Sequence, residues 1–250
     1  MASNSKTKTT VRRVSKTAAL IIATVLFACV AFFTTLVVLA HTSSLRASRA
    51  EYDHLREVAD EVGMESGEFN GAHLSPLDIE MLQINSDYVA WLRIDGTAID
   101  YPVVRGLDNT KYIDISFHGE KNVAGAIFMD YRNVGEDLPH IIIYGHNLQR
   151  GGMFSDLRKF LNRQYMEDNP IITLVVNGEE IDFVIFSARL TDISDPAYDL
   201  DLSNPRTFAR FADKIDAPLQ ATQIITLSTC ARRDGGGDAR IVVQGYRVFN

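Results

Sequence analysis

Residues 171–186 read Ile-Ile-Thr-Leu-Val-Val-Asn-Gly-Glu-Glu-Ile-Asp-Phe-Val-Ile-Phe, and this stretch decides the fold class. Two runs rich in β-branched and aromatic residues flank Asn177-Gly178, the dipeptide that most strongly favours a two-residue hairpin turn. The stretch therefore predicts an antiparallel pair of strands, Ile171–Val176 and Ile181–Leu190.

Six other short apolar runs predict further strands. They are Val89–Ile94, Ala98–Val104, Ala126–Met129, His140–Tyr144, Ile224–Thr229 and Ile241–Phe249. Two helices are expected among them, Met153–Asn162 and Pro205–Ile215, the second with Asn204 as its cap. Eight strands without regular alternation with helices predict a mostly β protein, a mixed or antiparallel barrel.

The N-terminal third has a different pattern. Residues 43–62 have apolar positions among charges at spacings that suit an amphipathic helix. The glycine-containing stretch Gly63–Ala72 is interpreted as a linker. Ser75-Pro76-Leu77-Asp78 is typical of a helix start. We therefore expect helices and a linker over residues 41–84 and one barrel domain over 85–250.

Thr17–Ala40 contains 24 consecutive uncharged residues, enough to cross a bilayer core as a helix. Five cationic residues precede it within residues 1–16, so the positive-inside rule predicts a cytoplasmic tail, a single-pass signal-anchor over 17–40 and an extracellular remainder. A cleaved signal peptide is the alternative, because Val38-Leu39-Ala40 has small residues of the kind found at cleavage sites. The apolar run is long for that alternative.

The charge balance argues against nucleic acid as a partner. The chain has 25 Lys and Arg residues and 32 Asp and Glu residues; five cations lie in residues 1–16, which leaves 20 against 32, or −12, for the rest. A domain this acidic is poorly suited to bind a phosphate backbone.

Cys230 is the candidate nucleophile. It ends the apolar run Ile224–Thr229, at the edge of a predicted buried strand, and the other cysteine, Cys29, lies within the apolar N-terminal span. A buried cysteine acting as a small hydrophobic residue is the structural alternative. A thiol nucleophile needs a proton acceptor or a cation nearby. Of the six histidines, His146 is the best candidate because it directly follows the strand His140–Tyr144, with Gly145 expected to permit an unusual backbone turn.

Arg240 is the candidate oxyanion stabiliser. It lies ten residues after Cys230 at the start of the last predicted strand, and a strand–loop–strand hairpin would return it close to the thiol. A surface arginine is the alternative interpretation of this residue.

These motifs resemble those of the sortase transpeptidases of Gram-positive bacteria. The resemblance lies in Tyr144-Gly145-His146-Asn147, Thr226-Leu227-Ser228-Thr229-Cys230 and Arg240-Ile241-Val242-Val243, in that order. Further stretches are similar to class B members, namely 87–97, 99–104, 125–133 and 153–157. One departure is Ala231, since many class B members have an acid directly after the cysteine. The match extends from about residue 80 to the end.

The resemblance implies an eight-stranded sortase barrel with N-terminal helices and a helix between strands six and seven, where Pro205–Ile215 fits. It implies that Cys230, His146 and Arg240 are catalytic and that substrate contacts come from Tyr144, Ser228, Asn109 and Ile113. The implied partners are surface proteins or pilins with a C-terminal sorting signal, cleaved after Thr, and an acceptor amine of a cell-wall precursor or a pilin lysine. It implies no cofactor and no metal.

Two other interpretations stay open. One is another cell-wall cysteine peptidase or an L,D-transpeptidase, although related peptidases usually place the cysteine before the histidine and the short L,D-transpeptidase signature is absent. The other is a membrane-anchored binding module on a sortase scaffold that has lost catalysis. A thioester trap with a signal peptide would distinguish it.

Overall fold

The computed structural model describes residues 15–63, 67–69, 72–135, 138–149, 151–202, 204–232 and 237–249. The chain divides into two compact units, residues 1–43 and 44–250. Helix α1 (Lys16–Val62) includes an 18-residue window with a mean hydropathy of 2.6, so by length and composition it is able to cross a membrane. Of the predicted basic tail, residues 1–14 lie outside the described residues.

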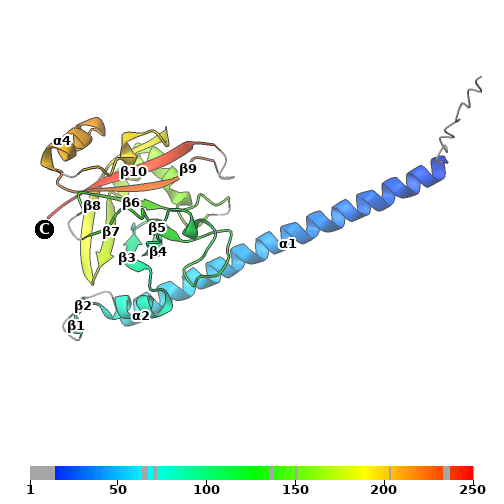
Figure 1. Ribbon diagram of the computed structural model, residues 1–250, viewed down its shortest axis with the longest axis horizontal. Coiled ribbons are helices and arrows are strands. Elements are labelled where there is room, and N and C mark those ends of the chain that lie inside the picture. Colours follow the sequence, from blue (N-terminus) through cyan, green and yellow to red (C-terminus); the bar gives the residue numbers. More distant parts are fainter. Residues whose placement is uncertain are drawn as a thin grey trace, which may run out of the picture. The chain divides into compact units, whose positions relative to one another are not determined.

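Within the described part of the second unit, eight strands close into a barrel in the order β10-β8-β7-β3-β4-β5-β6-β9 (Figure 1). The strands are β3 (Tyr88–Arg93), β4 (Asp100–Val104), β5 (Ile127–Met129), β6 (His140–Tyr144), β7 (Ile171–Val176), β8 (Glu179–Asp192), β9 (Ile224–Cys230) and β10 (Ala239–Arg247). Two neighbouring pairs are parallel, β4 with β5 and β6 with β9, and the others are antiparallel. The predicted eight-stranded mixed barrel is confirmed.

The β7–β8 hairpin forms as its turn residues predict. Asn177 and Gly178 both have positive φ, 52° and 75°, which a type I′ turn requires at its two central positions. Strand β8 runs to Asp192, beyond the predicted end, because its second half pairs with β10 from Asp192↔Ala239 onward.

Helix α4 (Pro205–Lys214) lies between β8 and β9, the sixth and seventh barrel strands, as predicted. The Asn204 side chain accepts hydrogen bonds from the backbone N–H groups of Arg206 and Thr207, so the predicted cap is present. Phe211 of α4 packs on the His140 ring with 4.6 Å between ring centroids.

The helix predicted at Met153–Asn162 is different in the structure. A 3₁₀ helix, η2 (Ser155–Leu161), occupies this stretch, and the short α-helix α3 (Arg163–Asp168) follows it. Met153 has φ 48°, which is not helical, so the first turn begins later. Asn162 is extended and its side chain caps the next helix, which ends the 3₁₀ turn there.

Residues 44–84 lie against the barrel core. The buried side chains of α1 are Ser48, Tyr52, Leu55 and Ala59, at the spacing of one helix face. Helix α2 (Pro76–Ile84) begins with the reciprocal capping box of Ser75 and Asp78. The stretch predicted as a linker contains strand β1 (Gly67–Phe69), which pairs with β2 (Ala72–Leu74).

Candidate active site

Cys230 is the last residue of β9 and is a free, partly exposed cysteine. The six residues before it in the strand are buried, so the barrel core holds the strand and its end reaches the surface. The Asn147 side chain donates a hydrogen bond from Nδ2 to the Cys230 carbonyl at 2.9 Å. The backbone of the thiol residue is therefore held from β9 and from the segment after β6.

Arg240 pairs directly with Cys230 on the antiparallel strands β9 and β10. Directly opposed residues of an antiparallel pair project from the same face of the sheet, so the thiol and the guanidinium side chains share one face. The Arg240 Nη1 donates hydrogen bonds to the carbonyls of Gly237 and Ala239 at 3.0 and 3.1 Å. The hairpin expected from the sequence is the one that brings Arg240 to the cysteine.

His146 lies two residues beyond the end of β6, the parallel neighbour of β9. Its Nε2 is 2.7 Å from the carbonyl oxygen of Ile113. A carbonyl only accepts, so Nε2 carries the proton and donates it, which leaves Nδ1 as the acceptor in the neutral ring. The His146 carbonyl accepts from the backbone N–H of Phe154 at 2.9 Å, so the ring and the backbone have separate anchors.

A groove of about 540 Å³ runs over this end of the barrel. Its lining includes all seven residues that the sequence analysis selected, namely Asn109, Ile113, Tyr144, His146, Ser228, Cys230 and Arg240. Apolar side chains contribute most of the remaining wall, among them Phe128 and Ile193. The groove thus combines a thiol, an imidazole and a guanidinium with an apolar wall, a set that can perform acyl transfer through a thioester.

Asp130 is a functional candidate that the sequence analysis missed. It is fully buried, and its carboxylate accepts hydrogen bonds from Asn109 Nδ2 and Tyr144 Oη, both at 2.9 Å. Arg132 donates to both carboxylate oxygens, at 2.8 and 2.9 Å. Burial acts to raise the pKa of Asp130, but the hydrogen bonds from Arg132, Asn109 and Tyr144 outweigh it and lower the pKa below its usual value. The signal in the sequence is an acid directly after the buried run Ile127–Met129.

Tyr198 was also missed. It ends the short 3₁₀ helix η3 (Pro196–Tyr198), lines the groove, and its hydroxyl lies 2.8 Å from Ser228 Oγ. Burial raises the pKa of Tyr198, so its hydroxyl stays protonated near neutral pH. The available signal is Asp195-Pro196, which predicts a turn, because the Asp195 side chain caps η3.

Gly145 has a role different from the predicted one. Its φ is not positive, so no left-handed turn requires the glycine. A Cβ at this position would lie 2.4 Å from Ile127 Cδ1 and 2.9 Å from Phe154 Cγ. The absence of a side chain therefore lets the chain pass between two buried residues just before His146.

Comparisons with known proteins agree with this arrangement. The family model described as Sortase domain matches residues 92–248. Sortase B of Listeria monocytogenes is 33% identical over 179 residues, which cover 68% of this chain and 73% of the relative. Sortase B of Staphylococcus aureus is 30% identical over 208 residues, which cover 79% of this chain and 84% of the relative.

Solved structures are similar as well. The sortase B of Bacillus anthracis in complex with AAEK1 superposes with a TM-score of 0.73 at 28% identity, over 83% of this chain and 99% of that one. The Staphylococcus aureus sortase B–substrate complex gives a TM-score of 0.68 at 27% identity, over 81% and 97%. With the closed eight-stranded barrel already established, these similarities show that the chain belongs to the sortase family and is a class B sortase, a cysteine transpeptidase.

Proposed function

We propose that this enzyme cleaves a C-terminal sorting signal after a Thr residue and joins the protein to an amine of the cell wall or of a pilin. The observation that supports this most directly is the register pair Cys230↔Arg240, in a groove that His146 also lines. A thiol beside a fixed cation suits attack on a carbonyl, because the charge that develops on the carbonyl oxygen has a partner within reach.

In the first half-reaction, the Cys230 thiolate attacks the carbonyl carbon of the Thr and forms a tetrahedral oxyanion, which Arg240 stabilises. The C–N bond then breaks, His146 donates a proton to the leaving amine, and a thioacyl enzyme remains. In the second half-reaction, the acceptor amine attacks the thioester, His146 takes its proton, and the Cys230 thiolate leaves. No cofactor is needed to balance either step.

The substrate contacts are proposed from the wall of the same groove. Tyr144 and Ser228 are paired residues on the parallel strands β6 and β9, and Asn109 lies beside Tyr144 on the shared Asp130 carboxylate. Ile113 is 44% exposed and adds an apolar surface next to His146. A short peptide with one apolar side chain and several backbone amides fits this mixture of polar and apolar wall.

We further propose that residues 17–40 anchor the enzyme in the cell membrane, with the N-terminus in the cytoplasm and the barrel outside. The long apolar helix and the five preceding cations support this orientation. N-terminal sequencing of protein extracted from membranes tests it. An intact N-terminal segment is expected, and a mature chain that starts at His41 would contradict the anchor.

The catalytic proposal is tested by trapping. The full chain in detergent is mixed with a peptide library that has Thr at a fixed position before the cleaved bond, and the protein is analysed by mass spectrometry. A thioacyl adduct on Cys230 is expected; it should be absent in Cys230→Ala and unchanged in Cys29→Ala, the matched control. Binding of peptide without any adduct would instead support a binding module, and an adduct on another residue would remove Cys230 from the mechanism.

The acceptor is identified in the same reaction. A lysine-containing pilin-like peptide and a cell-wall stem-peptide amine are added separately to the thioacyl enzyme. Faster loss of the adduct, with formation of the matching amide product, shows which amine the enzyme uses. Hydrolysis at the same rate with both amines would contradict transfer to either.

A further inference from the structure

Residues 44–62 of α1 contact both segments that hold His146. One is the β4–β5 loop, residues 105–126, whose Ile113 carbonyl accepts the hydrogen bond from the imidazole. The other is the His146 loop, residues 145–154. Each connection consists of specific contacts, so the helix next to the predicted anchor is linked to the catalytic site of the barrel.

The first connection runs from Tyr52 to Ile113. The buried Tyr52 hydroxyl donates a hydrogen bond to the Gly125 carbonyl at 3.0 Å. Gly125 has φ +59°, and a Cβ on it would lie 2.5 Å from the carbonyl oxygens of Tyr112 and Ile113. The Gly125 backbone is therefore packed directly against the carbonyl that accepts the proton of His146 Nε2.

A neighbouring residue holds the same loop at a second point. Glu51 Oε1 accepts hydrogen bonds from the backbone N–H of His118 at 3.0 Å and from its Nδ1 at 2.9 Å. Because His118 and Gly125 lie on either side of the loop's return, Glu51 and Tyr52 together restrain the loop against one helix turn.

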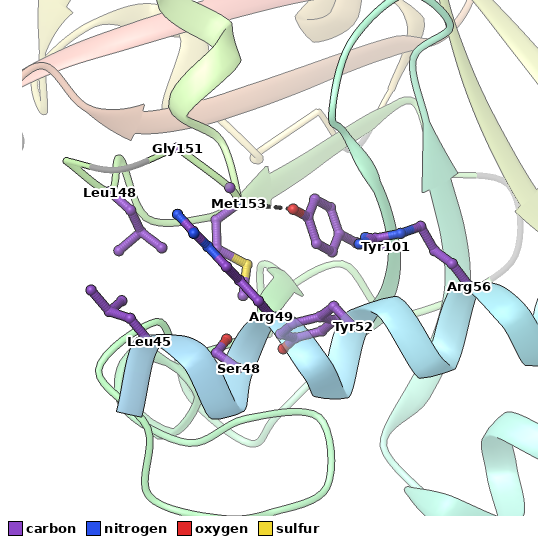
Figure 2. A pocket seen from close by; sticks show the side chains of 10 residues that line it. Leu45, Ser48, Arg49, Tyr52, Arg56, Tyr101, Leu148, Gly151 and Met153 are labelled. Carbon is purple, nitrogen blue, oxygen red and sulfur yellow. Dashed lines mark hydrogen bonds between the residues drawn. The ribbon is translucent and has the colours of Figure 1, made fainter. Parts of the chain in front are cut away.

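The second connection runs through Tyr101. Figure 2 shows the rings of Tyr52 and Tyr101 between α1 and the barrel, 5.3 Å apart between centroids and nearly perpendicular. The Tyr101 hydroxyl accepts a hydrogen bond from the Met153 N–H at 3.0 Å. Met153 forms a β-bridge with Asn147, the residue after His146. The same helix face thus supports the backbone that carries the imidazole.

Leu45 and Ser48 of α1 close this contact on one side. With Leu148 and Met153 they line an enclosed cavity of only about 40 Å³, so there is little free space between the helix and the His146 loop (Figure 2). Close packing of this kind transmits small displacements, because the neighbouring side chains have nowhere to relax.

We propose that Glu51 and Tyr52 of α1 are positioning residues for His146, acting through the β4–β5 loop and the Ile113 carbonyl. Burial raises the pKa of Tyr52, so its hydroxyl remains protonated and able to donate. Without this restraint the Ile113 carbonyl would be free to shift, and misplacement of a catalytic group by about 1 Å can cost roughly 100-fold in rate. Only the activity readout below rests on the proposed function.

The test compares Tyr52→Phe with the unchanged full chain in detergent micelles. Phe keeps the ring contact with Tyr101 and removes only the hydroxyl that reaches Gly125. In ¹⁵N-histidine NMR we expect the Nε2 signal of His146 to lose the shift of a hydrogen-bonded N–H and to exchange faster with water. With a sorting-signal peptide we expect kcat to fall by about 10- to 100-fold, with KM changed less than about twofold.

Tyr165→Phe is the matched control. It also removes a tyrosine hydroxyl that donates to a backbone carbonyl, that of Gly96 at 3.3 Å, but Gly96 has no part in either connection. The His146 signal and kcat should stay unchanged in this variant. An unchanged His146 signal in Tyr52→Phe, or an equal change in Tyr165→Phe, would overturn the proposal.

Glu51→Gln tests the proposal without touching the buried hydroxyl, and it serves if Tyr52→Phe does not fold. A smaller change of the His146 signal in the same direction is expected, and no change would overturn the proposal. The NMR result is independent of turnover. If the unchanged chain forms no thioacyl adduct while the His146 signal responds to Tyr52→Phe, the proposed function fails and the positioning role stands.

Discussion

Cys230 and Arg240 lie directly opposite each other on β9 and β10, although ten positions separate them in the sequence. The strand ladder, and not the intervening segment, fixes this relationship. The next pairs along it, Thr229↔Ile241 and Ser228↔Val242, consist of buried residues. The guanidinium is therefore held on the same sheet face as the thiol by the packing of the barrel core.

The roles of His146 and Arg240 can be separated by pH. His146→Ala should abolish most activity and remove one limb of the rate profile, because an imidazole titrates near neutral pH. Arg240→Lys keeps the charge but loses the planar fork, so the rate should fall by about 10²- to 10³-fold without movement of the remaining limb. Peptide-cleavage rates from pH 5 to 9 measure both effects. Full activity in Arg240→Lys would remove Arg240 from the site.

Asp130→Asn should impair substrate binding and stability together. The amide cannot accept all the hydrogen bonds that Asn109, Tyr144 and Arg132 donate to the buried carboxylate. We expect a loss of about 2 kcal/mol in the free energy of unfolding and a several-fold higher KM for the signal peptide.

Urea unfolding and peptide kinetics measure these two changes. Glu167→Gln, which breaks the exposed ion pair with Arg163, is the control and should alter unfolding by less than about 0.5 kcal/mol. A KM in Asp130→Asn equal to that of the unchanged enzyme would show that the carboxylate does not organise the groove.

His140 should make the fold sensitive to acid. Burial lowers the pKa of His140 to about 4, and its two ring nitrogens bond the Asp199 carbonyl and Thr226 Oγ1, each at 2.8 Å. The unfolded chain binds this proton near pH 6.5, so stability is present above that value and is lost as the pH falls toward 4, by roughly 3 kcal/mol in all.

The measurement is the urea midpoint at pH 7.0 and pH 4.5. His140→Gln should be less stable at pH 7.0 and should show a smaller difference between the two values. His54→Gln, at an exposed position of α1, should keep the full difference. Parallel pH dependence in His140→Gln and the unchanged chain would contradict the assignment.

Gly145→Ala should destabilise the barrel beside His146 by about 1 to 3 kcal/mol, because the new Cβ would collide with Ile127 Cδ1 and Phe154. Ile127→Val removes the nearer of the two colliding atoms. In a double-mutant cycle of melting temperatures, Ile127→Val should therefore recover part of the loss. Strict additivity of the two substitutions would argue against the collision.

The sequence by itself determined the elements whose causes are local. The Asn177-Gly178 turn, the Asn204 and Ser75 caps and the apolar strands appear where predicted, because turn and cap chemistry act within a few residues and a strand's apolar pattern is its own. The candidate residues Cys230, His146 and Arg240 could also be selected, because each directly ends, follows or begins a predicted strand.

Only the tertiary structure decided how these elements meet. The parallel pairing of β6 with β9 joins segments about 80 residues apart, and it is this pairing that brings the end of the His146 strand to the cysteine. Asp130 and Tyr198 owe their place in the groove to partners elsewhere in the chain, and no local pattern marks such contacts. The need for a glycine at 145 arises from the side chains of Ile127 and Phe154, which reach it only when the barrel closes.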